Sequence, residues 1–256
     1  MDSVEKREMR IAAVYDIHGN LPALDAVLAD IARANVDQII VGGDVLPGPL
    51  PRETIDRLLD LDIPVHFIRG NGDREVLAWR RGTESDAVPP AFHDVMRWVA
   101  GELSSDDEQL LAGWPMMASL ETDKLGEVLF CHATPRSDSE IFTRLTPEDR
   151  LVPVFAGIDA AIVVCGHTHI QFDRTVGRIR VANAGSVGMP FGEAGAYWLL
   201  LGSAVEFRRT SYDLFAAAER IRHTRYPQAA EFAAHNILAP PSEAEMLNAF
   251  ARAELK

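Results

Sequence analysis

The sequence predicts a mixed α/β fold in which helices cover a core of two β-sheets. Two observations predict it. Three strand–loop–helix units follow one another between residues 10 and 80, which is typical of a mostly parallel sheet with covering helices. Closely spaced apolar segments between residues 171 and 209 are instead typical of antiparallel strands. The chain has 256 residues, 47% of them hydrophobic, which suffices for one large core.

The first half of the chain alternates strands with helices. Asn20 can cap the first helix, and Pro22 falls in its first turn. The predicted elements are, in order, a strand at Arg10–Tyr15, a helix after Asn20, a strand at Gln38–Val41, a helix around Glu53–Leu61 and a strand at Val65–Ile68.

The second half has a different pattern. Residues 74–113 are predicted to be mainly helical, with Ser105 and Glu108 as a capping box, and a further helix is predicted at Pro147–Phe155. Strands are predicted at Met116–Leu120, Glu127–Phe130, Ala161–Val164, Gln171–Val176, Arg178–Val181, Tyr197–Leu201 and Val205–Arg209. We expect residues 1–211 to form one sandwich domain and residues 212–256 a helical extension packed on it.

The charge of the chain limits the partners it can have. The formal net charge is −13, which repels nucleic-acid backbones and anionic membranes. Apolar runs are strand-sized, and the N-terminus MDSVEKREMR lacks an apolar signal core. We therefore expect a cytoplasmic protein with no membrane and no stable nucleic-acid partner.

Metal-ligating residue types follow five of the predicted strands directly. Because ligands bind at the carboxyl ends of strands in open α/β sheets, these segments are expected to converge. Carboxylate and amide oxygens combined with imidazoles suit Mn²⁺, Zn²⁺ and Fe ions. The motifs are Asp16-Ile17-His18-Gly19-Asn20, Gly42-Gly43-Asp44, Gly70-Asn71-Gly72-Asp73, Cys131-His132 and Gly166-His167-Thr168-His169.

The ordered set Asp-x-His, Gly-Asp, Gly-Asn-x-Asp, His and Gly-His-x-His resembles the calcineurin-like metallophosphoesterase superfamily. The runs YDIHGNLPAL and NAGSVGMP resemble its small bacterial and archaeal phosphodiesterase branch. The resemblance covers roughly residues 10–210. It implies a four-layer αββα sandwich of two mixed sheets flanked by helices. It also implies two divalent metal ions (Mn, Fe, Zn or Ni), one held by Asp16, His18 and His169, the other by Asn71, His132 and His167, with Asp44 between them.

The resemblance implies hydrolysis of a small phosphorylated substrate by a metal-bridging hydroxide. It implies catalytic roles for Asp44, His18, Asn71 and Asp73, with Asp73 near His132 and orienting it. Phosphate would be bound by Asn71, and Arg74 is the best basic candidate for steering it into the site. The resemblance also brings the loop of residues 188–193 near the site, where a role in substrate selection is one interpretation.

One position departs from the family pattern. Many phosphomonoesterases of this superfamily have a histidine where this chain has Gly72, and general acid help is typically worth about 10²–10⁴-fold. A phosphodiester or phosphoanhydride substrate is therefore favoured, although His18 could supply the proton through water. The alternatives are a phosphomonoesterase, a protein phosphatase or a dinucleoside polyphosphate hydrolase, and, in another class, a catalytically inactive metal-dependent scaffold. The C-terminal helices either form a homodimer contact or pack on the sandwich.

Overall fold

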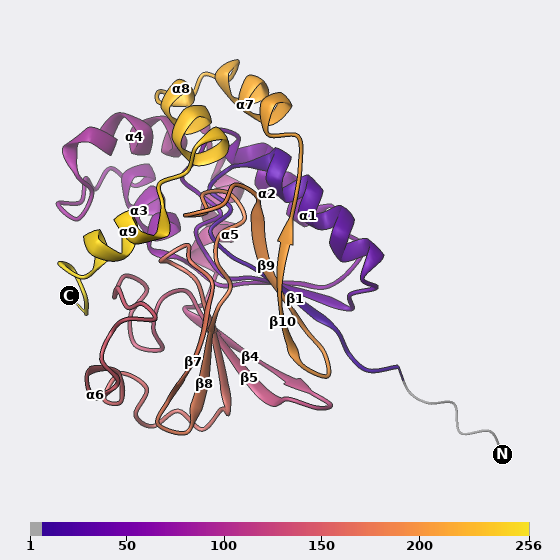
Figure 1. Ribbon diagram of the computed structural model, residues 1–256. Helices are drawn as coiled ribbons and strands as arrows, with labels where there is room; N and C mark the ends of the chain where they lie inside the picture. Colours follow the sequence, from indigo (N-terminus) through magenta and orange to yellow (C-terminus); the bar gives the residue numbers. More distant parts are fainter. Residues whose placement is uncertain (1–6, 256) are drawn as a thin grey trace.

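Two β-sheets packed face to face form the centre of the molecule (Figure 1). The computed structural model describes residues 7–255, and within these residues ten strands form two five-stranded mixed sheets. The first sheet has the order β10-β9-β1-β2-β3, with bounds Val205–Thr210, Ala196–Leu201, Ile11–Val14, Gln38–Val41 and Val65–Phe67. The second has the order β4-β5-β6-β8-β7, with bounds Met117–Thr122, Gly126–Cys131, Ile162–Cys165, Ile179–Asn183 and Phe172–Val176. The predicted mixed α/β fold with a two-sheet core is confirmed.

Helices flank the paired sheets. In chain order they are α1 (Leu21–Arg33), α2 (Pro51–Leu59), α3 (Asn71–Arg80), the 3₁₀-helix Pro90–Phe92, α4 (His93–Glu102), α5 (Ser105–Ala112), α6 (Glu148–Leu151), α7 (Leu214–Arg222), α8 (Ala229–Phe232), the π-helix Ala233–Leu238 and α9 (Glu243–Phe250). Among the described residues, no helix has the length and apolar character needed to span a lipid bilayer.

Strand β1 is buried on both of its faces. Side chains alternate along a strand, so Ala12 and Val14 pack in the helix-covered cluster, and Ile11 and Ala13 pack between the sheets. Its neighbours β2 and β9 run parallel and antiparallel to it, respectively. Burial of each large apolar side chain is worth about 1.5–3 kcal/mol. The chain that leaves the end of β1 at Asp16 is therefore held in a fixed position.

Helix α1 begins where the sequence predicts. The Asn20 side-chain oxygen accepts a hydrogen bond from the Ala23 N–H at 3.3 Å, which satisfies one of the free N–H groups of the first turn. The Asn20 amide also donates to the Gly188 carbonyl at 2.9 Å. The cap residue thus also connects the start of α1 to a loop of the second half of the chain.

Two local predictions are wrong. The capping box of α5 is made by Ser104 and Asp107, one residue before the predicted pair: the Ser104 hydroxyl accepts from the Asp107 N–H at 3.1 Å, and the Asp107 carboxylate accepts from the Ser104 N–H at 2.7 Å. The helix predicted at Pro147–Phe155 ends at Leu151 as α6. Residues beyond it leave the helical path, and Phe155 is buried against the outer face of the second sheet.

The C-terminal helices cover part of the first sheet's helical layer. Ala217 and Ile221 of α7 and Ile237 of the π-helix belong to the same buried cluster as α1. Helix α9 lies apart from them and the chain ends beyond it, near the loops of the second half (Figure 1). The predicted boundary at residue 211 stays a prediction.

Candidate metal centre

Side chains from both sheets converge at the carboxyl ends of their strands. Asp16 and His18 follow β1, Asp44 follows β2 and Asn71 begins α3 after β3. From the second sheet, His132 follows β5, and His167 and His169 follow β6. Seven residues from five separate segments of the sequence therefore lie at one edge of the molecule.

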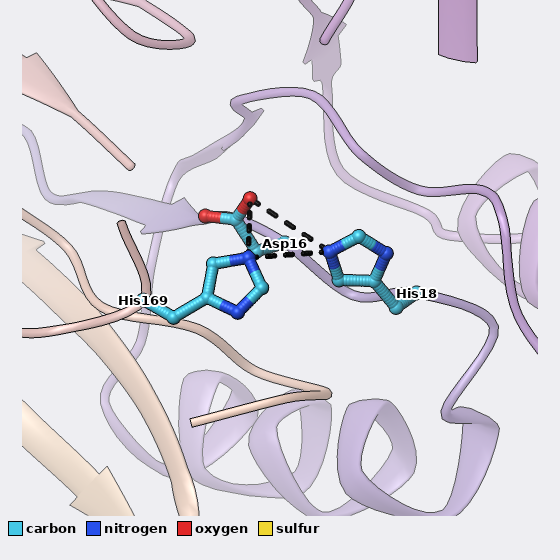
Figure 2. A group of neighbouring side chains, drawn as sticks. All are labelled: Asp16, His18 and His169. Carbon is cyan, nitrogen blue, oxygen red and sulfur yellow. Dashed lines mark hydrogen bonds and ion pairs between the residues drawn. The ribbon is translucent and has the colours of Figure 1, made fainter. Parts of the chain in front are cut away.

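Asp16, His18 and His169 form a compact group (Figure 2). The Nε2 atoms of the two imidazoles are 3.3 Å apart, and Asp16 Oδ1 lies 3.3 Å from His169 Nε2 and 4.0 Å from His18 Nε2. Ligand atoms about 2.0–2.2 Å from a tetrahedral ion are about 3.3–3.6 Å apart. The spacing of the group therefore fits a single ion at its centre.

A second group adjoins the first and shares its carboxylates. His132 Nε2 lies 3.6 Å from Asp44 Oδ1 and 3.9 Å from Asp16 Oδ1. The other Asp44 oxygen, Oδ2, lies 3.8 Å from His18 Nε2. The atom of the Asn71 side-chain amide that faces this group lies 3.1 Å from His132 Nε2 and 3.0 Å from His167 Nδ1, and it can bind a cation when the amide oxygen occupies that position. The two oxygens of Asp44 thus face different groups, as a bridging carboxylate requires.

Backbone carbonyls orient three of the imidazoles. A carbonyl oxygen can only accept, so each Nδ1 carries a proton and each Nε2 is the ring atom that faces the carboxylates. The acceptors are Pro47 for His18 (3.1 Å), Gly42 for His132 (2.9 Å) and Met189 for His169 (2.7 Å). Such contacts fix the tautomer and ring orientation of metal-binding histidines. Sequence reasoning missed them, because no local pattern identifies the carbonyl group that accepts a hydrogen bond from a distant ring.

Most of the predicted ligands have an unfavourable backbone conformation. Non-glycine residues with positive φ are uncommon, and each costs on the order of 1–3 kcal/mol. Such strain gathers at functional sites, where the surrounding structure enforces it. Five predicted ligands have positive φ: Asp16 (53°), His18 (49°), Asp44 (49°), His167 (67°) and His169 (57°).

The buried polar atoms of the site fit a cation. Within residues 7–255, Asp16 Oδ1 and His167 Nε2 are buried and have no hydrogen-bond partner. The Nε2 atoms of His18 and His169 face each other at 3.3 Å, so a proton or a cation must lie between them. Imidazole nitrogens and carboxylate oxygens are the donors that Mn²⁺, Fe and Zn²⁺ accept. The residues present therefore fit divalent metal ions.

Protonation states agree with that donor set. Burial, followed by the nearby charge of His132, lowers the pKa of His167 to about 4, so its ring is neutral at pH 7. Burial opposes ionisation of Asp16, but His169 and the other histidines lower its pKa below the usual value. The site thus combines an ionised carboxylate with an imidazole that has a free lone pair.

The structure gives Asp73 hydrogen-bond partners other than His132. Its carboxylate does not hold His132, whose Nδ1 is held by the Gly42 carbonyl. Asp73 accepts hydrogen bonds from three backbone N–H groups, those of Asp44 (2.8 Å), Leu46 (2.9 Å) and Gly70 (3.0 Å). It therefore fixes the loop that carries Asp44 against the start of α3.

Arg74 is paired with two carboxylates. Its guanidinium makes two hydrogen bonds to Asp138, at 2.8 and 3.1 Å, and one to Glu75 at 2.5 Å. Both carboxylates are largely buried, so its charge is already balanced. Asp138 lies 64 residues away in the sequence, and nothing local indicates the pair; the steering of phosphate by Arg74 stays a prediction.

Position 72 cannot hold a side chain in this arrangement. A Cβ atom on Gly72 would lie 2.7 Å from Pro47 Cδ and 2.9 Å from the Leu46 carbonyl oxygen. The Gly72 N–H also donates to Asp44 Oδ1 at 2.7 Å. The loop after β2 therefore occupies the space that the Cβ atom of a histidine at position 72 would need.

The fold and the convergent donor set define a metallophosphoesterase-like protein, and comparison with known proteins gives the family. Residues 9–202 match the calcineurin-like phosphoesterase superfamily domain, and the chain belongs to that family. It is 30% identical over 239 residues to protein MJ0912 of Methanocaldococcus jannaschii, covering 85% of this chain and 94% of that one. It is 34% identical over 77 residues to the phosphodiesterase YfcE of Escherichia coli, covering 27% of this chain and 42% of YfcE. The crystal structure of a metallophosphoesterase from Sphaerobacter thermophilus superposes with a TM-score of 0.67 at 25% identity, covering 88% and 98% of the two chains.

Proposed function

We propose that the protein hydrolyses a phosphodiester or phosphoanhydride with two divalent metal ions bound at the convergent site. The observation that carries the proposal is the buried Asp16 Oδ1 atom. It accepts no hydrogen bond within the described residues, yet it lies within 3.3 to 4.0 Å of three imidazole nitrogens. A buried carboxylate oxygen in that setting needs a cation to balance it.

Each predicted ligand has a place in the proposed centre. One ion takes Asp16, His18 and His169, the other takes Asn71, His132 and His167, and Asp44 offers one oxygen to each. When bound, such a pair of ions acidifies a shared water and neutralises charge on the phosphoryl oxygens. The two carboxylates leave the centre with net positive charge, so it attracts phosphate although the chain carries −13 overall.

The protein's own residues do the positioning. Asp73 fixes the Asp44 loop through three N–H groups, and the Gly72 N–H holds one Asp44 oxygen. The carbonyls of Pro47, Gly42 and Met189 fix the imidazole rings. We assign Asn71 to phosphate as well as to metal, since its amide lies at the edge of the second group.

The diester preference rests on the leaving group. Position 72 supplies no general acid, and the adjoining Pro47 loop leaves no room for one there. Esters whose leaving group needs a proton, such as alkyl monoesters, lose the most from that absence. The local similarity to YfcE, whose name is that of a phosphodiesterase, supports the same choice.

A substrate panel in the presence and absence of chelator tests the proposal. Metal-free protein supplemented with Mn²⁺, Zn²⁺, Fe²⁺ or Ni²⁺ is given bis(p-nitrophenyl) phosphate, p-nitrophenyl phosphate and diadenosine tetraphosphate. We expect turnover of the diester to exceed that of the monoester, to vanish in excess chelator and to return with Mn²⁺. Preferred turnover of the monoester would favour a phosphomonoesterase, and preferred turnover of the tetraphosphate would favour a dinucleoside polyphosphate hydrolase.

Activity that persists in excess chelator would overturn the metal-dependent mechanism. Absence of all turnover in metal-replete protein would favour the inactive scaffold. Cytoplasmic location and a homodimer through the C-terminal helices stay predictions, to be checked by cell fractionation and by light scattering.

A further inference from the structure

An aromatic path connects the last helix of the chain to the candidate metal centre. The Phe191 ring lies over the His169 imidazole, with ring centroids 5.2 Å apart and planes only 18° from parallel. Phe191 also contacts Phe250 of α9, at a centroid distance of 6.0 Å and an angle of 56° between the ring planes. Three rings therefore lead from the end of α9 to a predicted metal ligand.

We propose that Phe191 is a positioning residue that fixes the His169 imidazole for metal binding, and that residues 239–255, the C-terminal strap, hold Phe191 in place. The inference rests on the proposed metal site but adds residues to it that lie outside the ligand set. It also gives α9 a role that sequence reasoning did not assign.

The C-terminal strap is anchored on both sides of Phe250. Before it, the Gly192 N–H donates to the Pro241 carbonyl at 2.8 Å, and Glu243 forms an ion pair with Arg144 at 2.7 Å. After it, the Glu254 carboxylate accepts hydrogen bonds from the Thr146 hydroxyl (2.7 Å) and the Arg150 guanidinium (3.0 Å), and the Leu255 N–H donates to the Ile141 carbonyl (2.9 Å). The strap thus joins the loop that carries Phe191 to the segment of residues 141–150.

His169 needs such support more than His132 does. Its backbone is strained, with a φ of 57°, and its ring has one hydrogen bond to the backbone, from Nδ1 to the Met189 carbonyl. That hydrogen bond lies in the plane of the ring, so it does not prevent rotation of the ring about the axis of the bond. The flat face of Phe191 blocks that tilt. His132 is 1% exposed, so its own burial already restrains it.

Metal titration of full-length variants tests the positioning role. Metal-free protein is titrated with Mn²⁺ by calorimetry, and the loading is followed by electron paramagnetic resonance. In Phe191→Ala we expect one of two binding events to weaken by about 10–100-fold, the usual effect of losing a group that supports a ligand. In Phe250→Ala the same event should weaken by less. Phe215→Ala is the control, because Phe215 is an exposed phenylalanine of α7, outside this path.

Unchanged affinity for both ions in folded Phe191→Ala would overturn the proposal, and so would equal weakening of both ions. If Phe191→Ala does not fold, Phe191→Leu replaces it, since leucine keeps apolar volume but has no flat face. If the wild-type protein binds no Mn²⁺, the proposed function fails separately. The positioning role is then read from ¹⁵N resonances of His169: one Nδ1–H tautomer is expected in the wild type and a mixture in Phe191→Leu. Identical spectra would overturn it.

Discussion

The two halves of the candidate site differ in charge and in how they are held. The first-sheet half consists of Asp16, His18, Asp44 and Asn71, and it contains both carboxylates. The second-sheet half consists of His132, His167 and His169, and it offers imidazoles alone. In the first-sheet half, each ligand segment leads into a helix of the covering layer, whereas in the second-sheet half the ligand segments lead into loops.

The difference separates two tasks. In the proposed centre, the negative charge that faces both ions comes from the first-sheet half. The loop that carries Asp44 is fixed by hydrogen bonds from backbone N–H groups to Asp73. The second-sheet half supplies imidazole donors, His169 to the first group and His132 and His167 to the second. In the proposed centre neither half alone would hold both ions, so the packing between the sheets would set their separation. At Gly166 this packing is so close that a Cβ atom would lie 2.5 Å from Asp16 Oδ2.

The largest expected effect comes from breaking the charged half. In Asp44→Ala, both groups lose an oxygen, so we expect both ions to be lost and diester turnover to fall by more than about 10²–10³-fold. In His169→Ala, only one group loses a ligand, so one ion should remain. Metal content per chain after dialysis, measured by atomic emission, separates the two outcomes.

Asp60→Ala is the matched control for this comparison, because Asp60 is an exposed aspartate at the end of α2. It should keep both ions and full turnover. Retention of two ions by Asp44→Ala would show that Asp44 does not bridge, and the contrast between the two halves would then lose its basis.

The sequence predicted which side chains converge because its signals are local. Each motif follows an apolar strand, and a strand's end fixes which residues lie at the sheet's edge, so Asp16 and His169 could be placed on one rim from residues alone. Asn20 was predictable as a cap for the same reason, since its partner Ala23 is three residues away.

Roles that depend on distant partners could not be predicted. Arg74 is paired by Asp138, and Phe191 is backed by Phe250, 59 positions further along the chain. Asp73 holds Leu46 across the site instead of orienting His132. In each case the partner lies far away in the sequence, so only the tertiary packing identifies it.

A histidine at position 72 sharpens the comparison within the first-sheet half. Gly72→His adds a proton donor on the substrate side, so the ratio of monoester to diester turnover should rise, by up to about 10²-fold if the ring reaches the leaving group. The new Cβ atom meets Pro47 and the Leu46 carbonyl, so the loop must shift. Initial rates with an alkyl phosphate monoester, whose leaving group needs a proton, and with bis(p-nitrophenyl) phosphate, whose leaving group does not, give the ratio.

Gly72→Ala is the control for the steric effect, because it introduces the Cβ contact without the imidazole. Both variants should lose some diester activity, but only Gly72→His should change the ratio. An equal ratio in all three proteins would remove the argument that the absent imidazole determines substrate preference.

The smallest expected effect lies at the junction of the two halves. Tyr15 is fully buried between the sheets, and its hydroxyl donates to the Val164 carbonyl at 3.1 Å, joining the end of β1 to β6. Tyr15→Phe should lower the free energy of unfolding by about 1 kcal/mol, the typical worth of one hydrogen bond, measured by urea denaturation. Tyr197→Phe removes a similar bond, to the Glu193 carbonyl at 2.9 Å, but one that joins only neighbouring residues. If this junction sets the spacing of the proposed ions, Tyr15→Phe should weaken Mn²⁺ binding, whereas Tyr197→Phe should not. Equal Mn²⁺ affinities of the two variants would show that apolar packing alone sets the spacing.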